Sequence, residues 1–230
     1  MSEPRESRQS MIFDRTFLTN MEDVTEIIFV RHGEQETILE SDPPLTDRGR
    51  KQVRLVGLRF STERVDVIYT SSLKRAMATS EEIARHHRLT PKVVEDLREI
   101  QLFRNLPGES TVVDHIGKEM LAGVAERMFR EKKWDVFPFS ESSLDFRNRT
   151  ANAIEAIIAT NQGSRIVIAC HAGVINSYIA HIIGLEYDMF FRPVHSSVSV
   201  VHAAAGGIRA LQSLNDAHHL KTTEGSLITF

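Results

Sequence analysis

The chain has 230 residues and a formal net charge of -3; 41% of its residues are hydrophobic and 26% are charged. These values are typical of globular proteins and exclude a disordered or collagen-like chain. Lysine and arginine are dispersed, so no basic stripe is present that would follow a nucleic-acid backbone. The single cysteine, Cys170, has no partner for an internal disulfide. We therefore expect a reducing, cytoplasmic setting and no nucleic-acid partner.

The first 25 residues carry charges in every turn and contain no apolar stretch long enough for the core of a signal peptide. Elsewhere the apolar runs are about 4–6 residues long, whereas a membrane-spanning helix needs about 20. We predict an N-terminal arm over residues 1–25 and no membrane partner. Four apolar residues of this arm are candidates to pack on the body of the protein: Ile12, Phe13, Phe17 and Leu18.

Three short apolar runs rich in β-branched residues predict strands that are buried on both faces of a sheet. They span residues 26–30, 65–69 and 166–170. Each run is followed by a polar turn and then by a helical pattern, an alternation typical of a mostly parallel sheet. The predicted fold is therefore α/β, with three layers in which helices cover both faces of a central sheet.

Helix signals lie between these strands. Thr46 is expected to cap a helix that runs to about Phe60, and Ser71 or Ser72 is expected to cap the next one, which runs to about His86. Apolar residues at three- and four-residue steps predict further helices within 113–128, 151–158 and 173–184, the last lying directly on the sheet.

An alternating pattern at 197–201 and 208–214, separated by Gly206 and Gly207, predicts an edge hairpin. No repeat or linker divides the chain, so we predict one domain over 26–216. Within it, residues 100–145 are interpreted as a helical insertion over the carboxyl ends of the strands, on the substrate side. Residues 217–230 are interpreted as a C-terminal tail.

Cationic and imidazole side chains follow each of the three predicted strands. Arg31 and His32 come directly after the first strand, a short turn leads from the second to Arg75, and His171 ends the third. In open parallel sheets, ligands bind beyond the carboxyl ends of the strands. Two guanidinium groups and two imidazoles would therefore meet at one rim, where they would form an anion pocket.

The ordered set of motifs resembles the histidine phosphatase superfamily, also called phosphoglycerate mutase-like. The similarity covers most of the chain from 26 to 214 and implies a phosphoglycerate mutase-like fold. It also implies a phosphohydrolase that cleaves phosphate monoesters of small metabolites through a phosphohistidine. The fragments that carry it are IIFVRHGE at 27–34, PLTDRGRKQ at 44–52, IYTSSLKRAMATSEEIA at 68–84, DLREI at 96–100, ESSLDFRNR at 141–149 and IVIACHAGVIN at 166–176.

The resemblance implies a role for individual residues. His32 would be the nucleophile, and the neighbouring arginines should lower its pKa. Arg31, Arg75 and His171 would bind the phosphoryl oxygens, where charge is spread during transfer. Glu99 in DLREI would protonate the leaving oxygen and then activate water.

Some positions of the site stay open at this point. A shift of one turn would exchange Glu99 with Glu95 or Asp96. An asparagine often follows RHGE in the family, whereas this chain has Gln35 and no asparagine nearby, and the usual Gly-x-Trp-x-Gly pattern after the acid is replaced by QLFRN at 101–105. His195 follows Pro193 in a loop that could reach the pocket; the remaining histidines are interpreted as surface, packing or chain-end residues.

No cluster of His, Cys and carboxylates has metal-ligand spacing, so we expect neither a metal nor a cofactor. A phosphoglycerate mutase-type transfer is the first alternative. Such enzymes carry a long basic insertion after the acid, whereas Arg104 is the only cation between Glu99 and Ser110. A non-catalytic module that binds phosphorylated ligands is the second, although it would be expected to have lost a reacting group. The natural substrate stays open, as does a homodimer.

Overall fold

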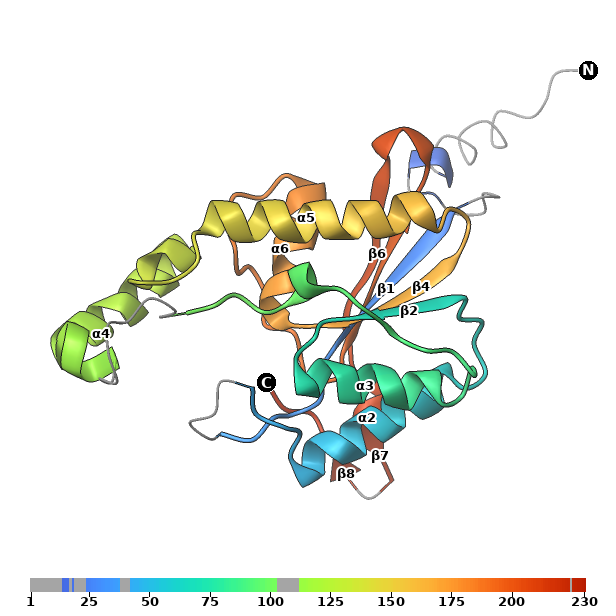
Figure 1. The fold of residues 1–230 in the computed structure, drawn as a ribbon, viewed down its shortest axis with the longest axis horizontal. Coiled ribbons are helices and arrows are strands. Elements are labelled where there is room, and N and C mark those ends of the chain that lie inside the picture. Colours follow the sequence, from blue (N-terminus) through green and yellow to red (C-terminus); the bar gives the residue numbers. More distant parts are fainter. Residues whose placement is uncertain (1–13, 17, 19–23, 38–41, 103–111, 224) are drawn as a thin grey trace, which may run out of the picture.

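The computed structural model describes residues 14–16, 18, 24–37, 42–102, 112–223 and 225–230. Within these residues, a six-stranded sheet with the order β3-β2-β4-β1-β5-β6 forms the centre of the fold (Figure 1). The first four of these strands pair in parallel, and β5 is antiparallel to both β1 and β6. The mostly parallel sheet is therefore confirmed. The strands are β1 Thr25–Arg31, β2 Val67–Thr70, β3 Lys92–Val93, β4 Arg165–Cys170, β5 Val198–Ala203 and β6 Arg209–Asp216.

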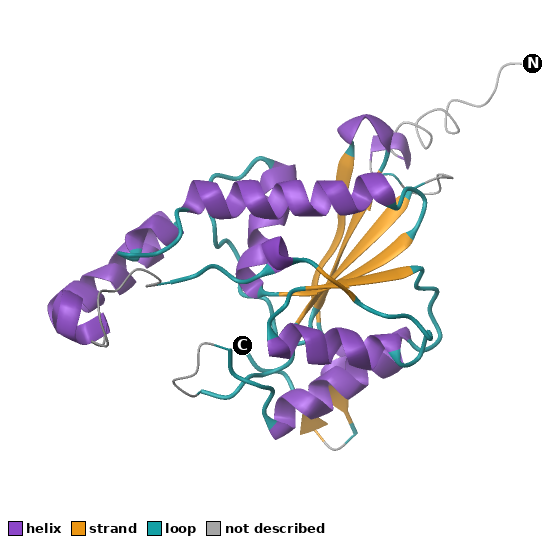
Figure 2. Cartoon of the chain, in the orientation of Figure 1, coloured by secondary structure: helices purple, strands orange, loops and turns teal. Residues whose placement is uncertain are grey.

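Helices cover both faces of the sheet, which confirms the three-layer prediction (Figures 1 and 2). Helices α2 (Asp47–Phe60) and α3 (Lys74–Ala84) lie on one face, and α5 (Ser143–Thr160) and α6 (Ala172–Ile183) lie on the other. Helix α4 (Val112–Glu131) supplies the helical part of the predicted insertion and extends outward from the sheet in Figure 1.

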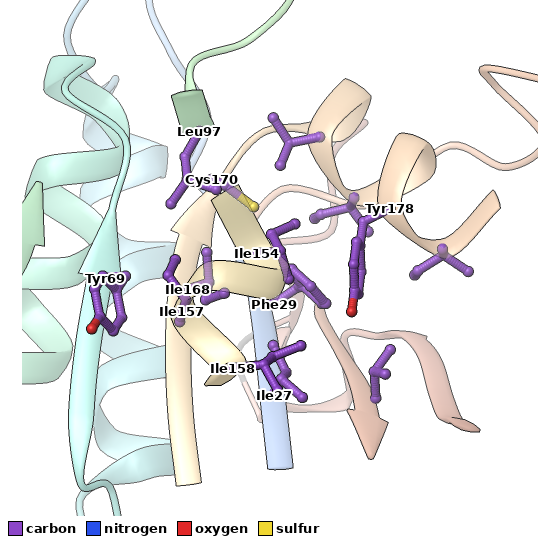
Figure 3. Close-up of a cluster of buried hydrophobic side chains, with 14 of the residues drawn as sticks. Ile27, Phe29, Tyr69, Leu97, Ile154, Ile157, Ile158, Ile168, Cys170 and Tyr178 are labelled. Atoms are coloured by element: carbon purple, nitrogen blue, oxygen red, sulfur yellow. The ribbon is translucent and has the colours of Figure 1, made fainter. Parts of the chain in front are cut away.

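Strand β1 separates two hydrophobic clusters because its successive side chains point to opposite faces. Ile27 and Phe29 pack with the apolar faces of α5 and α6 (Figure 3), whereas Ile28 and Val30 pack with those of α2 and α3. All four are fully buried. This burial on both faces explains why the strand reads as an uninterrupted apolar run.

The helix boundaries agree with the sequence in most places. The Thr46 hydroxyl accepts from the backbone N–H of Gly49 at 2.9 Å, as expected of an N-cap. The prediction that Ser71 or Ser72 caps α3 is wrong, because α3 starts at Lys74 and its N-cap, Leu73, makes no side-chain capping bond. Ser71 is instead buried and directed at His171.

The structure departs from the sequence prediction near the two ends of the domain and in several short elements. Leu18 is buried and its carbonyl lies 3.1 Å from Nδ1 of His202, whereas Ile12, Phe13 and Phe17 fall outside the described residues. In the predicted edge hairpin only β6 is an edge strand, because β5 also pairs with β1. Short elements missed by the sequence patterns are the edge strand β3, the hairpin β7 (Lys221–Thr222) and β8 (Gly225–Ser226), and the 3-10 turns Glu95–Leu97, Trp134–Val136, Ala205–Gly207 and His218–Leu220.

Candidate active site

The carboxyl ends of the three central strands bring the predicted side chains together. His32 directly follows β1, and its backbone N–H donates to the carbonyl of Cys170 at the end of β4 at 3.0 Å. His171 follows Cys170, and the centroids of the His32 and His171 rings are 5.1 Å apart. Both rings are buried. The alignment of two parallel strands thus places two imidazoles side by side.

The hydrogen bonds of His32 fix its tautomer. Nδ1 lies 2.7 Å from the carbonyl oxygen of Gly33, which can only accept, so Nδ1 carries the proton. Nε2 is therefore unprotonated in the neutral ring, and Nε of Arg75 donates to it at 3.2 Å. Burial, followed by the charges of His171, Arg75 and Arg31, holds the pKa of His32 well below its usual range. The ring is therefore a neutral base whose Nε2 lone pair accepts the N–H of Arg75.

Arg31 and Arg75 line a cavity of about 610 Å³, which His32 and Glu99 also line. NH2 of Arg31 lies 3.0 Å from Nε2 of His195, and NH1 of Arg31 donates to the carbonyl of Pro193. NH1 of Arg75 lies 3.6 Å from Oδ1 of Asp42. Burial lowers the pKa of Arg31 to about 10, so its guanidinium stays charged at neutral pH.

Two buried nitrogen atoms of this cluster have no hydrogen-bond partner within the described part of the chain. They are Nε of Arg31 and Nδ1 of His171. Buried polar atoms are normally partnered, so both nitrogens are candidates to bind a ligand. Arg31 lines the cavity, whereas His171 is fully buried and is not among the lining residues. The other nitrogen of His171, Nε2, lies 2.9 Å from the hydroxyl of Ser71, and that hydroxyl accepts from the N–H of Leu73 at 3.2 Å. If Ser71 donates to His171, Nδ1 carries a proton and can donate to an anion.

Glu99 lies in the cavity at the N-terminus of α6. Its Oε2 accepts from the backbone N–H of Gly173 at 3.0 Å, and its Oε1 accepts from that of Ile100 at 3.1 Å. Burial nevertheless raises its pKa, outweighing these bonds and the charges of Arg75 and Arg31. A Cβ at position 173 would lie 2.2 Å from Oε1, so glycine is required for this approach.

The structure separates Glu99 from the two acids that the sequence could not distinguish from it. Glu95 is exposed and lies against Ser72 and Arg98, and Asp96 is exposed as well. Neither lines the cavity. Arg149 donates to the carbonyls of Asp96 and Arg98 at 2.7 and 2.9 Å, which fixes the backbone directly before Glu99.

Sequence reasoning underestimated three further residues. His195 lines the cavity, and its ring centroid lies 5.7 Å from that of His32. Ser71 follows β2 as His171 follows β4, so its position after a strand was the signal that could have found it. Asp42 carries no such signal. The other described histidine side chains outside the motifs do not line the cavity. Within the same residues, no group of three or more His, Cys, Asp or Glu could hold a metal ion.

Comparisons with known proteins agree with this geometry. The model of the histidine phosphatase superfamily (branch 1) matches residues 27–217, and the chain belongs to this superfamily. It is 30% identical to phosphoglycerate mutase-like protein 4 of Arabidopsis thaliana, over 87% of this chain and 89% of that protein. It is 27% identical to phosphoserine phosphatase 1 of Hydrogenobacter thermophilus, over 78% and 87% of the two chains.

Solved structures show the same fold. A mycobacterial glucosyl-3-phosphoglycerate phosphatase superposes with a TM-score of 0.70 at 20% identity, over 84% of this chain and 99% of the other. A phosphoglycerate mutase from Bacillus anthracis superposes with a TM-score of 0.69 at 18% identity, over 86% and 96%. The phosphoglycerate mutase-like fold expected from the motifs is thus confirmed. The family and the named relatives together support an enzyme of the histidine phosphatase type.

Proposed function

We propose that this protein is a phosphomonoesterase in which Nε2 of His32 attacks phosphorus and forms a phosphohistidine. The observation that carries the proposal is the state of the His32 ring. Its Nδ1 proton is held by the Gly33 carbonyl, and its unprotonated Nε2 accepts from Arg75; both His32 and Arg75 line the cavity. A nucleophilic imidazole needs an unprotonated nitrogen, and the tautomer supplies one at Nε2. The N–H of Arg75 that Nε2 accepts would have to turn to a phosphoryl oxygen when substrate binds.

The phosphoryl group would be held by Arg31, Arg75 and His171. Arg31 and His171 each have one buried nitrogen without a partner among the described residues, and phosphoryl oxygens would satisfy both. Charge on these oxygens is stabilised by fixed donors, so the residues need no metal ion for this purpose. We therefore include metal independence in the proposal.

Glu99 would act first as an acid and then as a base. Its raised pKa keeps a proton available at a higher pH than for an exposed glutamate, and that proton would pass to the leaving oxygen. The resulting carboxylate would then take a proton from the water that hydrolyses the phosphohistidine. The Gly173 N–H at the N-terminus of α6 stabilises the ionised form that this second step requires.

Hydrolysis is favoured over mutase-type transfer by the charges that line the cavity. Its described cationic residues are Arg31 and Arg75, both already assigned to one phosphoryl group. Glu34 and Glu36 line the same cavity and would repel a second anionic group of a phosphoglycerate, and a further cation, Arg98, lines an adjoining pocket that shares Arg75 and Glu99. The relatives carry both phosphatase and mutase names. Phosphatase activity on small phosphorylated metabolites, in the cytoplasm, is the function we propose.

The test uses an aryl phosphate with the purified protein and its His32→Ala variant. The wild type should release inorganic phosphate, and acid quench at early times should trap phosphate on a histidine. His32→Ala should lose both signals while circular dichroism stays unchanged. Turnover near the wild-type rate in His32→Ala would refute the assignment. With a phosphoglycerate as substrate, isomer formation that exceeds phosphate release would favour the mutase.

A further inference from the structure

The segment from Leu227 to Phe230 packs against the active-site cavity. The backbone N–H of His195 donates to the carbonyl of Thr229 at 2.9 Å. The next residue, Phe230, lines the cavity, and its ring lies 5.3 Å from the guanidinium of Arg192. In Figure 1 this end of the chain lies near the helices α2 and α3. Part of the predicted tail over 217–230 thus contacts the functional site.

The side chain of Gln52 in α2 holds this segment in place. It is fully buried, and its Nε2 donates to the carbonyl of Leu227 and to the hydroxyl of Thr229, each at 2.8 Å. Its Oε1 accepts from the backbone N–H of Glu34 at 2.8 Å. One buried amide therefore joins the segment to the loop that carries His32.

His195 connects Thr229 to Arg31. Nε2 of His195 lies 3.0 Å from NH2 of Arg31, and Nδ1 lies 3.0 Å from the Thr229 hydroxyl. Arginine can only donate, so Nε2 must accept and Nδ1 must carry the proton. The Thr229 hydroxyl oxygen then accepts from His195 and from Gln52. Each of these contacts therefore pairs a donor with an acceptor.

The same loop fixes both ends of the Arg31 guanidinium. Pro193 supplies the carbonyl for NH1, and His195 supplies the acceptor for NH2. A planar guanidinium held at both terminal nitrogens has one orientation, and its unpartnered Nε then has a fixed direction as well. Burial lowers the pKa of His195 to about 4, so the ring remains a neutral acceptor at neutral pH.

We infer that His195 and Thr229 are positioning residues of the active site, which set the orientation of Arg31 for phosphoryl binding. The segment 227–230 is thereby a part of the phosphate pocket, although it lies outside every motif that identifies the family. This inference rests on the proposed function in one respect, namely that Arg31 binds the phosphoryl group.

Paired variants separate positioning from general stability. His195→Leu removes both hydrogen bonds of the ring, whereas His195→Gln keeps an acceptor for Arg31 and a donor for Thr229. Thr229→Val removes the hydroxyl at nearly constant volume, whereas Thr229→Ser keeps it. Thr223→Val is the control, because Thr223 is exposed in the same tail and does not line the cavity. The readouts are KM and kcat for nitrophenyl phosphate, the inhibition constant of inorganic phosphate, and the thermal midpoint.

We expect His195→Leu and Thr229→Val to raise KM and the phosphate inhibition constant by about 10-fold, the effect of weakening one hydrogen bond to a charged group. For His195→Gln, Thr229→Ser and Thr223→Val, KM and the phosphate inhibition constant should stay within about 3-fold of the wild type, because these variants keep the hydrogen bonds to Arg31 and His195. A lowered thermal midpoint with unchanged KM and inhibition constant in His195→Leu and Thr229→Val would overturn the inference.

Hydrolysis of nitrophenyl phosphate by the wild type separates failure of this inference from failure of the proposed function. If the wild type does not hydrolyse nitrophenyl phosphate, the proposed function fails. If it does, and His195→Leu and Thr229→Val bind phosphate as tightly as Thr223→Val does, only the positioning role of His195 and Thr229 fails.

Discussion

Glu99→Gln tests the proposed proton transfer, and the structure defines what this substitution removes. Both carboxylate oxygens of Glu99 accept a backbone N–H, from Ile100 and from Gly173. Glutamine has a single acceptor oxygen, so one of these N–H groups would face an NH₂ group. Leaving a buried donor unsatisfied costs about 1–3 kcal/mol, and we expect the free energy of unfolding to fall by that amount.

The catalytic loss should depend on the leaving group. An alkyl phosphate needs its leaving oxygen protonated, so kcat/KM for this substrate should fall by about 10²–10⁴-fold. Nitrophenyl phosphate releases an acidic phenol, which needs less protonation, and its loss should be about 10-fold or less by the same reasoning. The ratio of the two losses cancels any common effect of altered packing, because both substrates use the same variant.

The assay is steady-state hydrolysis of both substrates, combined with acid quench to detect phosphohistidine. With nitrophenyl phosphate, the variant should still form phosphohistidine. The wild type should lose activity on the alkyl phosphate as pH rises through the raised pKa of Glu99, since the acid is then ionised. Equal losses for the two substrates would refute the proton-donor role and indicate that Glu99 acts through folding or positioning.

Three further predictions follow from other contacts. EDTA should leave the rate unchanged within about 2-fold, because fixed arginines supply the positive charge; a metal-reversible loss would contradict this. Arg149→Met should lower the free energy of unfolding in urea by about 3–5 kcal/mol, since it leaves buried Glu141 without its ion-pair partner; an unchanged urea midpoint would argue against it. Burial lowers the pKa values of His195 and His219 to about 4, below their unfolded value, so stability should be fully present above about pH 6.5. Between about pH 6.5 and 4, each of these histidines should lower the free energy of unfolding by about 1.4 kcal/mol for every unit that the pH falls. Urea titrations at several pH values should therefore show a smaller pH dependence for His219→Gln than for the wild type.

The sequence predicts the centre of the fold well because that centre depends on strong local patterns. Strand β1 is an uninterrupted apolar run since both of its faces are buried, and α2 has a side-chain cap at Thr46. Strand β3 was missed because Lys92 and Val93 are both exposed, and two residues cannot display a periodicity. The hairpin β7–β8 is equally short.

The candidate site was predictable where it coincides with strand ends. His32, Arg31 and His171 are placed by β1 and β4, and the alternation of strands and helices already indicated that their ends meet. His195 lies in a loop without a motif, and its relation to Arg31 depends on a tertiary contact 164 positions apart. No local pattern encodes a contact over such a separation, so only the folded structure identifies it.

The register between β1 and β4 sets the distance between the two imidazoles of the site. Arg31 is paired with Cys170, so His32 and His171 are the next residues after two strands held one strand spacing apart, about 4.8 Å. Their separation is therefore set by main-chain hydrogen bonds and not by the surrounding loops. A one-residue deletion within β4 would move His171 to the opposite face of the sheet and disable the pocket. Loops bordering the cavity take no part in this pairing, so we expect changes in them to leave the distance between the two imidazoles unaltered.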